Sequence, residues 1–126
     1  MTSFAFDANI IIDALIGRGG AREELRRARS SGERLWMSRV AWIEVMSKSG
    51  GSVLRGTENF LTSFAIDELD PEIAARAAAL RRERPRLRSP DAIILASAMV
   101  RGRILVTRNT KDFPANMPGI RVPYTL

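Results

Sequence analysis

The sequence contains no cysteine and no histidine. Without cysteine the chain has no disulfide, thiolate nucleophile or zinc-thiolate site. Without histidine it lacks an imidazole base and the commonest transition-metal ligand. A metal ion bound by side chains of this protein would therefore be held by oxygen atoms.

Long hydrophobic runs are also missing. The longest uncharged apolar run, residues 92–100, is far shorter than the ~20 residues of a membrane-spanning helix. The opening stretch MTSFAFDANIIID carries two aspartates and no basic residue, so it does not resemble a secretory signal. We therefore expect a cytoplasmic protein with no membrane segment.

The remaining composition is that of an ordinary globular chain. Of 126 residues, 45% are hydrophobic and 27% charged, with 9 glycines and 6 prolines, which excludes disordered and collagen-like classes. A chain of this length can bury a real core. We expect a single domain over residues 1–126.

The charge is strongly one-sided. The formal net charge is +6, and arginine outnumbers lysine 18 to 2. Three explanations remain open: compositional bias with a solvated surface, binding of nucleic acid, or an acidic protein partner.

Alternating short apolar runs and helical patterns predict an α/β fold. Strands are expected at 3–6, 34–38, 64–67, 103–107 and 120–122, with helices between them. This alternation is typical of a mostly parallel central sheet of about five strands, covered by helices on both faces in three layers.

Several helix ends are marked in the sequence. We expect the first helix, from Asn9, to stop at the glycines 17, 19 and 20, and Asp70 with Pro71 to begin another. Ser89 is expected to cap the apolar helix that follows it, and residues 85–88 to be extended.

Four acids are expected at one edge of this sheet. In parallel sheets ligands bind beyond the carboxyl ends of the strands, where Asp7, Asp91 and Asp112 would lie. Glu44, nearly two turns into its helix, can reach the same edge if that helix leans across. Each also has an ordinary explanation. Asp7 could cap a helix, and Asp91 could lie in a first turn because the helix dipole stabilises an acid there. Asp112 could be an ordinary turn residue, and Glu44 could pair with Lys48.

Glu44 is the hardest of these to explain as a surface residue. It lies within the apolar run VAWIEVM, residues 40–46, which we expect to be mostly buried. A carboxylate in such a helix costs several kcal/mol unless it finds strong partners. A divalent cation shared with the other acids would be one, and it would support metal-assisted attack by water.

Four ordered blocks of the sequence resemble the PIN-domain ribonucleases, and most closely the VapC-type toxins of bacterial toxin–antitoxin pairs. The blocks are FDANIIIDALIG, the IEV glutamate, SPDAIILASA and ILVTRNTKDFP. The resemblance covers nearly the whole chain and implies a three-layer α/β/α PIN-like domain.

The resemblance implies a metal-binding and catalytic cluster of Asp7, Glu44, Asp91 and Asp112, with Asn9, Thr107 and Asn109 as polar neighbours. Either Asn109 or Asp112 would occupy the fourth position. Ala8 stands where the family often has a threonine or serine, so one hydroxyl is missing. The implied reaction is Mg²⁺- or Mn²⁺-dependent hydrolysis of RNA that leaves 5′-phosphate and 3′-hydroxyl ends.

Basic residues flank these acids in the sequence. Four of them are candidates for contacts with the RNA backbone, with a solvated surface as the alternative: Arg84, Arg86, Arg88 and Arg108. The resemblance further implies a homodimer and a cognate VapB-like antitoxin with an acidic or amphipathic segment that covers the site.

Two other classes of protein also place an acid after the first strand of a parallel sheet. Aspartyl-phosphate phosphatases need a second acid two residues after the first, where this chain has Asn9, and receiver domains need acids and a lysine that it does not provide. The alternative that remains is a catalytically silent RNA- or protein-binding module that keeps its acids as helix caps.

Overall fold

Five short strands form one parallel sheet in the computed structural model of the protein, which describes residues 2–126. The strands are β1 (Phe4–Phe6), β2 (Leu35–Ser38), β3 (Phe64–Asp67), β4 (Ile104–Val106) and β5 (Ile120–Arg121). Their order is β3-β2-β1-β4-β5, so β1 is central and pairs with β2 and β4. The predicted α/β class with a parallel sheet is confirmed.

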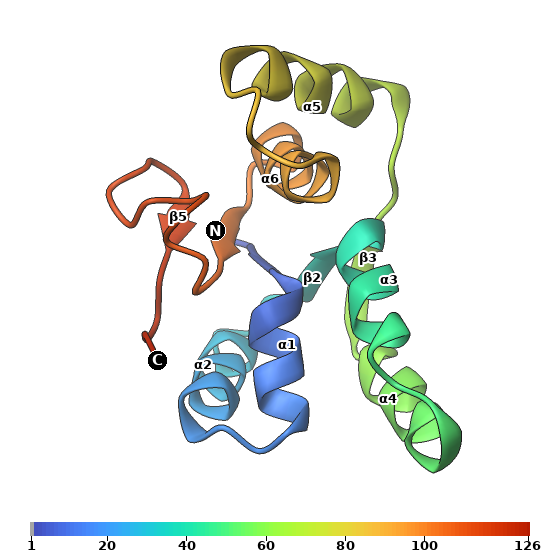
Figure 1. Cartoon of the computed structure of the whole chain (residues 1–126). Helices are drawn as coiled ribbons and strands as arrows, with labels where there is room; N and C mark the ends of the chain where they lie inside the picture. Colours follow the sequence, from blue (N-terminus) through green and yellow to red (C-terminus); the bar gives the residue numbers. More distant parts are fainter. Residues whose placement is uncertain (1) are drawn as a thin grey trace.

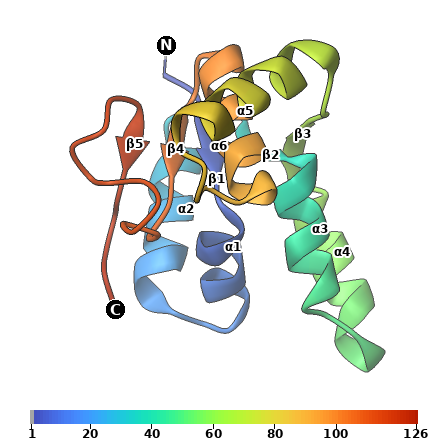
Figure 2. The same ribbon diagram turned by 45° about the horizontal axis from the view of Figure 1, so that its top comes forward.

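Helices pack around this sheet in layers. They are α1 (Ala8–Leu15), α2 (Gly19–Ser30), α3 (Arg39–Ser47), the short 3₁₀ turn η1 (Gly51–Val53), α4 (Leu54–Leu61), α5 (Pro71–Glu83) and α6 (Ser89–Arg101). Helix α6 packs against β2 and β4 and is covered by α5. Helices α1 and α2 lie on the opposite side, and α3 and α4 lie side by side next to them (Figures 1 and 2).

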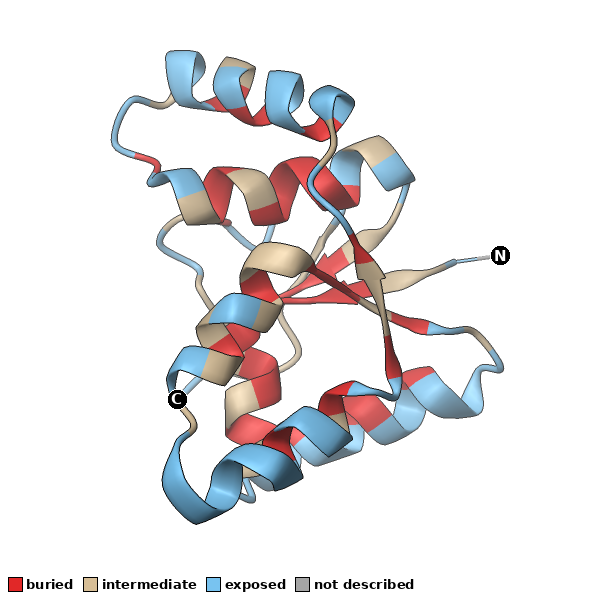
Figure 3. Cartoon of the chain, turned by 90° about the vertical axis from the view of Figure 1, so that its right-hand side faces the viewer, coloured by how far each residue is buried: buried red, intermediate tan, exposed pale blue. Residues whose placement is uncertain are grey.

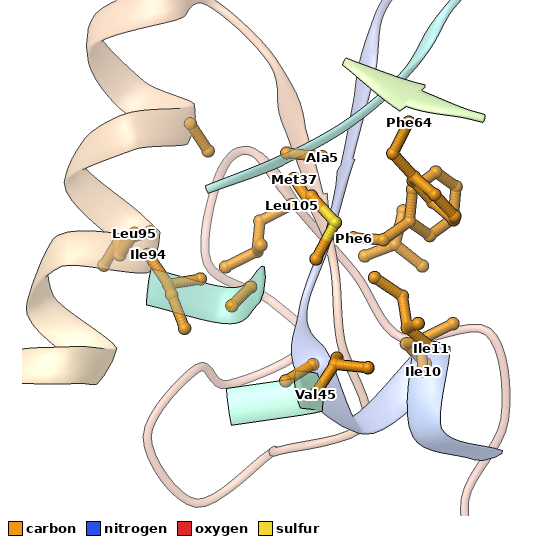
Figure 4. Close-up of a cluster of buried hydrophobic side chains, with 14 of the residues drawn as sticks. Ala5, Phe6, Ile10, Ile11, Met37, Val45, Phe64, Ile94, Leu95 and Leu105 are labelled. Carbon is orange, nitrogen blue, oxygen red and sulfur yellow. The ribbon is translucent and has the colours of Figure 1, made fainter. Parts of the chain in front are cut away.

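The core extends to both faces of the sheet. Phe6, Met37 and Leu105 are each at most 1% exposed and come from three neighbouring strands. Figure 4 shows these strand residues between Ile94 and Leu95 of α6 on one side and Ile10 and Ile11 of α1 on the other. The helices turn their buried residues toward the sheet and their exposed residues outward (Figure 3). Within residues 2–126, no helix is long and apolar enough to cross a bilayer.

Side chains cap the starts of two helices, one of them at the expected Asp70. The Asp70 carboxylate accepts a hydrogen bond from the Ile73 backbone N–H at 2.8 Å, and Pro71 occupies the first turn of α5. Ser38 caps α3 in the same way through the Ala41 N–H at 3.0 Å. Since α3 begins directly at the end of β2, its first turns stay close to the edge of the sheet.

Three local expectations need correction. The first helix stops at Gly17, with φ +91°, as expected, but Gly19 and Gly20 belong to the start of α2. A side chain at Gly20 would lie 3.1 Å from the Tyr124 ring, so this glycine serves packing. Residues 85–88 form a turn, in which the Leu87 N–H bonds Arg84 O at 2.9 Å. Arg88, not Ser89, is the N-cap of α6, which brings Ser89, Pro90 and Asp91 into its first turn.

Candidate metal centre

An open cleft of about 560 Å³ lies where β1, β2 and β4 lead into the following helix or loop. It is lined by Asp7, Ala8, Asn9, Ile12, Glu44, Lys48, Arg88, Asp91, Arg108, Asn109, Thr110 and Lys111. Three of the four predicted acids therefore share one cavity. The fourth, Asp112, does not line this cleft but a neighbouring hollow.

Asp7 is the most rigidly held of the acids. It is 4% exposed, and its Oδ1 accepts the Ala8 backbone N–H at 2.8 Å. Its Oδ2 accepts the Thr107 hydroxyl at 2.8 Å and the Asn9 amide at 3.3 Å. Asp7 thus caps α1 and faces the cleft at once. Because Thr107 supplies a hydroxyl to this carboxylate, the one that Ala8 lacks is not needed to hold it.

Glu44 reaches the cleft from the second turn of α3. The expectation that residues 40–46 are mostly buried was wrong, because only Ala41 and Val45 of α3 are buried and Ile43 is 52% exposed. Glu44 itself is half-buried. Within residues 2–126 its carboxylate forms no hydrogen bond and no ion pair, so the suggested pair with Lys48 is not made.

Asp91 and Asp112 approach from two further elements. Asp91 is 6% exposed in the first turn of α6, and its nearest cation is the Arg88 Nε, 3.4 Å away. Asp112 lies in the loop after β4, where its Oδ2 accepts the Asn109 amide at 2.9 Å and its backbone N–H bonds Asn109 Oδ1 at 3.2 Å. Asn109 is therefore the residue of this pair that lines the cleft, with Asp112 braced against it.

The cleft acids are electrostatically unlike the other buried acids. Arginine side chains donate two hydrogen bonds each to Asp13 and Asp67 and five to Glu24, and in every case at least one of them is 2.8 Å or shorter. Asp7 and Glu44 have no arginine partner within the described chain, and Asp91 has only the longer contact with Arg88. Although the chain has 18 arginines, none within residues 2–126 forms a short two-bond pair with these three acids, which leaves carboxylate oxygens open to a bound cation.

The poor pairing of the cleft acids is reflected in their pKa values. Burial raises the pKa of Asp7, against hydrogen bonds from Thr107 and Ala8, and the charge of Asp91 raises it further. Burial and then the charges of Asp7 and Asp91 raise the pKa of Glu44. Burial also raises the pKa of Asp91, against Arg88 and with a contribution from Asp112. Each of the four acids therefore lies within electrostatic range of at least one other.

The donor set fits a hard divalent cation. Carboxylate oxygens from Asp7, Glu44 and Asp91 meet the amide of Asn109 in one water-accessible cleft, and such oxygens are the ligands that Mg²⁺ and Mn²⁺ prefer. Among residues 2–126 no three acids already converge tightly enough to form a complete metal cage. An ion would have to draw these carboxylates together.

The profile of the PIN domain matches residues 4–116 of this sequence. The chain belongs to the PIN-domain family. A chain of the toxin–antitoxin complex from Klebsiella pneumoniae is 39% identical, with a TM-score of 0.88 and coverage of 98% of this chain and 100% of that one. The resemblance of the motifs to VapC-type PIN proteins is thus confirmed. No curated protein matches the sequence.

Two more distant structures share the fold of this PIN domain. DNA-bound VapBC from Salmonella typhimurium is 24% identical, with a TM-score of 0.74 and coverage of 96% of each chain. FitAcB from Neisseria gonorrhoeae is 19% identical, with a TM-score of 0.78 and coverage of 98% and 99%. At these identities the likeness supports the architecture alone.

The predicted arginines divide into two groups in this PIN domain. Arg88 and Arg108 line the acidic cleft. Arg84 and Arg86 instead line a neighbouring hollow that shares Lys111 with it. Sequence reasoning missed Lys48 and Lys111 as cleft residues. Their rarity could have revealed them, because these are the only two lysines of the chain and both line this cavity.

A substitution at Asp91 tests whether the cleft acids are strained without metal. Because the folded-state pKa of Asp91 is raised, this acid costs stability at neutral pH, and the cost disappears as the pH falls through that pKa. We expect metal-free Asp91→Asn to be more stable than wild type by about 1 kcal/mol at neutral pH, with no advantage in acid. Urea unfolding at both pH values measures this.

Added Mn²⁺ should reverse the order, since an ion bound only by the folded state stabilises that state. We expect Mn²⁺ to raise the Tm of wild type more than that of Asp91→Asn. Glu58→Gln, at an exposed acid of α4 outside the cleft, is the matched control and should respond as wild type does. Equal Tm shifts in all three proteins would contradict a metal centre at Asp91.

Proposed function

We propose that this PIN domain is the toxin of a toxin–antitoxin pair and acts in the cytoplasm as a Mg²⁺- or Mn²⁺-dependent endoribonuclease. The observation that carries the proposal is the set of three cleft acids, Asp7, Glu44 and Asp91, of which the first two have no arginine partner within the described chain and the third has only the 3.4 Å contact with Arg88. The relative from Klebsiella pneumoniae, part of a toxin–antitoxin complex, supports the biological role.

In this proposal Asp7, Glu44 and Asp91 would hold one divalent ion, and Asn109 with Asp112 would support a second. Such an ion supplies a water of lowered pKa and neutralises charge that develops on a phosphate. Asp7 is suited to anchoring because Thr107 and the Ala8 N–H fix both its oxygens. Glu44 is suited to orienting a water and accepting its proton, because no protein group occupies its carboxylate and its pKa is raised.

The cations of the cleft support a nucleic-acid substrate. Lys48, Arg88, Arg108 and Lys111 line the same cavity as the acids. A site that only stored metal would have no need of four cations, whereas a phosphodiester backbone brings a negative charge with every nucleotide. Water attack on that backbone at the acids would leave a 5′-phosphate on one fragment and a 3′-hydroxyl on the other.

The ends of cellular RNA give the most direct test. After brief expression, wild type should create new 5′-phosphate ends that Asp7→Asn does not create, because the amide cannot supply the carboxylate charge. Glu58→Gln is the matched acid-to-amide control and should cleave as wild type does. If RNA sequencing gives identical end maps for wild type and Asp7→Asn, the nuclease assignment fails and the silent binding module is favoured.

The two lysines provide a second test, on binding rather than cleavage. Lys48→Gln with Lys111→Gln should weaken binding of single-stranded RNA and make it less salt-dependent. Each lost phosphate contact lowers the slope of log K against log salt by about 0.7. Fluorescence anisotropy with a labelled RNA in the Asp7→Asn background measures this without cleavage.

The control for the lysine pair is Arg76→Gln with Arg82→Gln, which removes two exposed charges from α5 at the same cost in net charge. If both double variants reduce the slope equally, the overall charge of the protein, not the cleft, governs RNA binding.

A groove next to the cleft supports an antitoxin as partner. One hollow shares Ile12 and Lys48 with the cleft. It continues through Leu15 into a cavity lined by Leu25, Phe60 and three arginines, Arg22, Arg26 and Arg29. An apolar floor with basic walls suits an acidic amphipathic helix that leads toward the acids. We propose that the antitoxin binds here, and that the toxin is a homodimer as the family resemblance implies.

Charge reversal tests this groove. Arg26→Glu with Arg29→Glu should abolish copurification with the product of the adjacent gene, while RNA cleavage by the free protein continues. Arg76→Glu with Arg82→Glu makes the same charge change on α5 and should leave copurification intact. Copurification that survives the first pair would place the partner elsewhere.

A further inference from the structure

One cation of the cleft, Arg108, is fixed by hydrogen bonds to residues other than the cleft acids. Arg108 lines the cleft, and its side chain is 32% exposed. Its Nε and Nη2 donate to the two oxygens of Asp13 at 2.7 and 3.2 Å, and its backbone N–H bonds Asn9 Oδ1 at 3.3 Å. Main chain and guanidinium are thus both fixed.

Asp13, the anchor, is completely enclosed. It lies in α1, is 1% exposed, and accepts the Tyr124 hydroxyl at 2.8 Å in addition to the two bonds from Arg108. Burial alone would raise the pKa of Asp13, but bonds from Arg108 and Tyr124 outweigh it and lower that pKa. Asp13 is therefore ionised at neutral pH, and its charge faces Nε and Nη2 of Arg108.

Tyr124 comes from the last residues of the chain and is its only tyrosine. Its ring lies against Gly20, where a side chain would be 3.1 Å from the ring. Its hydroxyl stays protonated because burial and then the bond to Asp13 raise its pKa. The C-terminal segment is thereby connected through Asp13 to the wall of the cleft.

This arrangement leaves part of the guanidinium available. Nη1 of Arg108 has no protein partner among residues 2–126 and is not enclosed. The charge of Arg108 also reaches the acids, since it opposes the rise in the pKa of Asp7. By contrast, the Arg88 side chain is 79% exposed, and Lys48 and Lys111 are exposed. Arg108 is the preorganised cation of the cleft.

We propose that Asp13 and Tyr124 are positioning residues, which hold Arg108 so that its free edge binds a phosphate of the substrate. The inference rests on the nuclease function proposed above and adds a role for the C-terminal segment in substrate binding. A guanidinium fixed before the substrate arrives loses little freedom on binding, which is how preorganised donors gain affinity. Lysine cannot reproduce this, because it lacks the planar set of donors that Asp13 holds.

Three variants test the proposal by anisotropy with a labelled single-stranded RNA in the Asp7→Asn background. Arg108→Ala removes the cation and should weaken binding about 10- to 100-fold, within the range for a charged hydrogen bond. Tyr124→Phe removes a single oxygen and should weaken binding about three- to tenfold. Adding Tyr124→Phe to Arg108→Ala should then cause no further loss, because Tyr124 acts through Arg108.

The matched control is Arg121→Lys, which alters a two-bond arginine pair with the buried Glu24 outside the cleft. It should lower the Tm and leave RNA binding unchanged. If Tyr124→Phe likewise lowers only the Tm, the bonds of Asp13 to Tyr124 and Arg108 are structural and the inference is overturned. The same holds if Tyr124→Phe weakens RNA binding as much in the Arg108→Ala protein as in the protein that keeps Arg108.

Failure of the proposed nuclease function would give a different result from failure of the positioning role of Asp13 and Tyr124. In that case wild type would not cleave RNA, whether or not the Asp7→Asn parent binds it. A parent that binds, with variants that bind equally well, overturns the role of Asp13 and Tyr124 alone.

Discussion

The burial together of carboxylates that the protein leaves poorly paired is the constraint on which the rest of this structure depends. Asp7, Glu44 and Asp91 line one cleft, where burial raises the pKa of each and the charge of a neighbouring acid raises it further, while Asp13, Glu24 and Asp67 are each paired with arginine. Folding brings the first group together at a cost that hydrophobic burial elsewhere must offset. A protein that did not use those charges would gain stability by pairing or removing them.

The fold makes this convergence possible with few residues. Since β1 is central and its neighbours β2 and β4 run parallel to it, the segments that follow all three strands lie at one edge. Asp7 follows β1, α3 with Glu44 follows β2, and Asn109 follows β4. Asp91 arrives on α6, which packs over β2 and β4. Strands of three or four residues are sufficient for this, because their role in the site is to place the residues that follow them at the same edge of the sheet.

The sequence predicted those features that depend on neighbouring residues. Strand positions, the Asp70 cap and the placement of three acids at one edge follow from local patterns and from the rule for parallel sheets. The burial of α3 was misjudged, because an apolar run does not tell how many of its sides find a partner. The link from Asp13 to Tyr124 could not be predicted either, since 111 residues separate them and no periodicity connects them.

The choice between lysine and arginine in the cleft follows from the same electrostatics. Arginine binds carboxylates through two parallel hydrogen bonds, as at Glu24 and Asp67, so a free arginine near Asp7 or Glu44 would compete with a cation for them. Lysine is a compact, strongly hydrated charge that competes less well. A chain with 18 arginines nevertheless places both its lysines here. Arg108, whose positive charge acts on Asp7, is paired with Asp13, and this pairing keeps the charge at the cleft while preventing the guanidinium from pairing with the cleft acids.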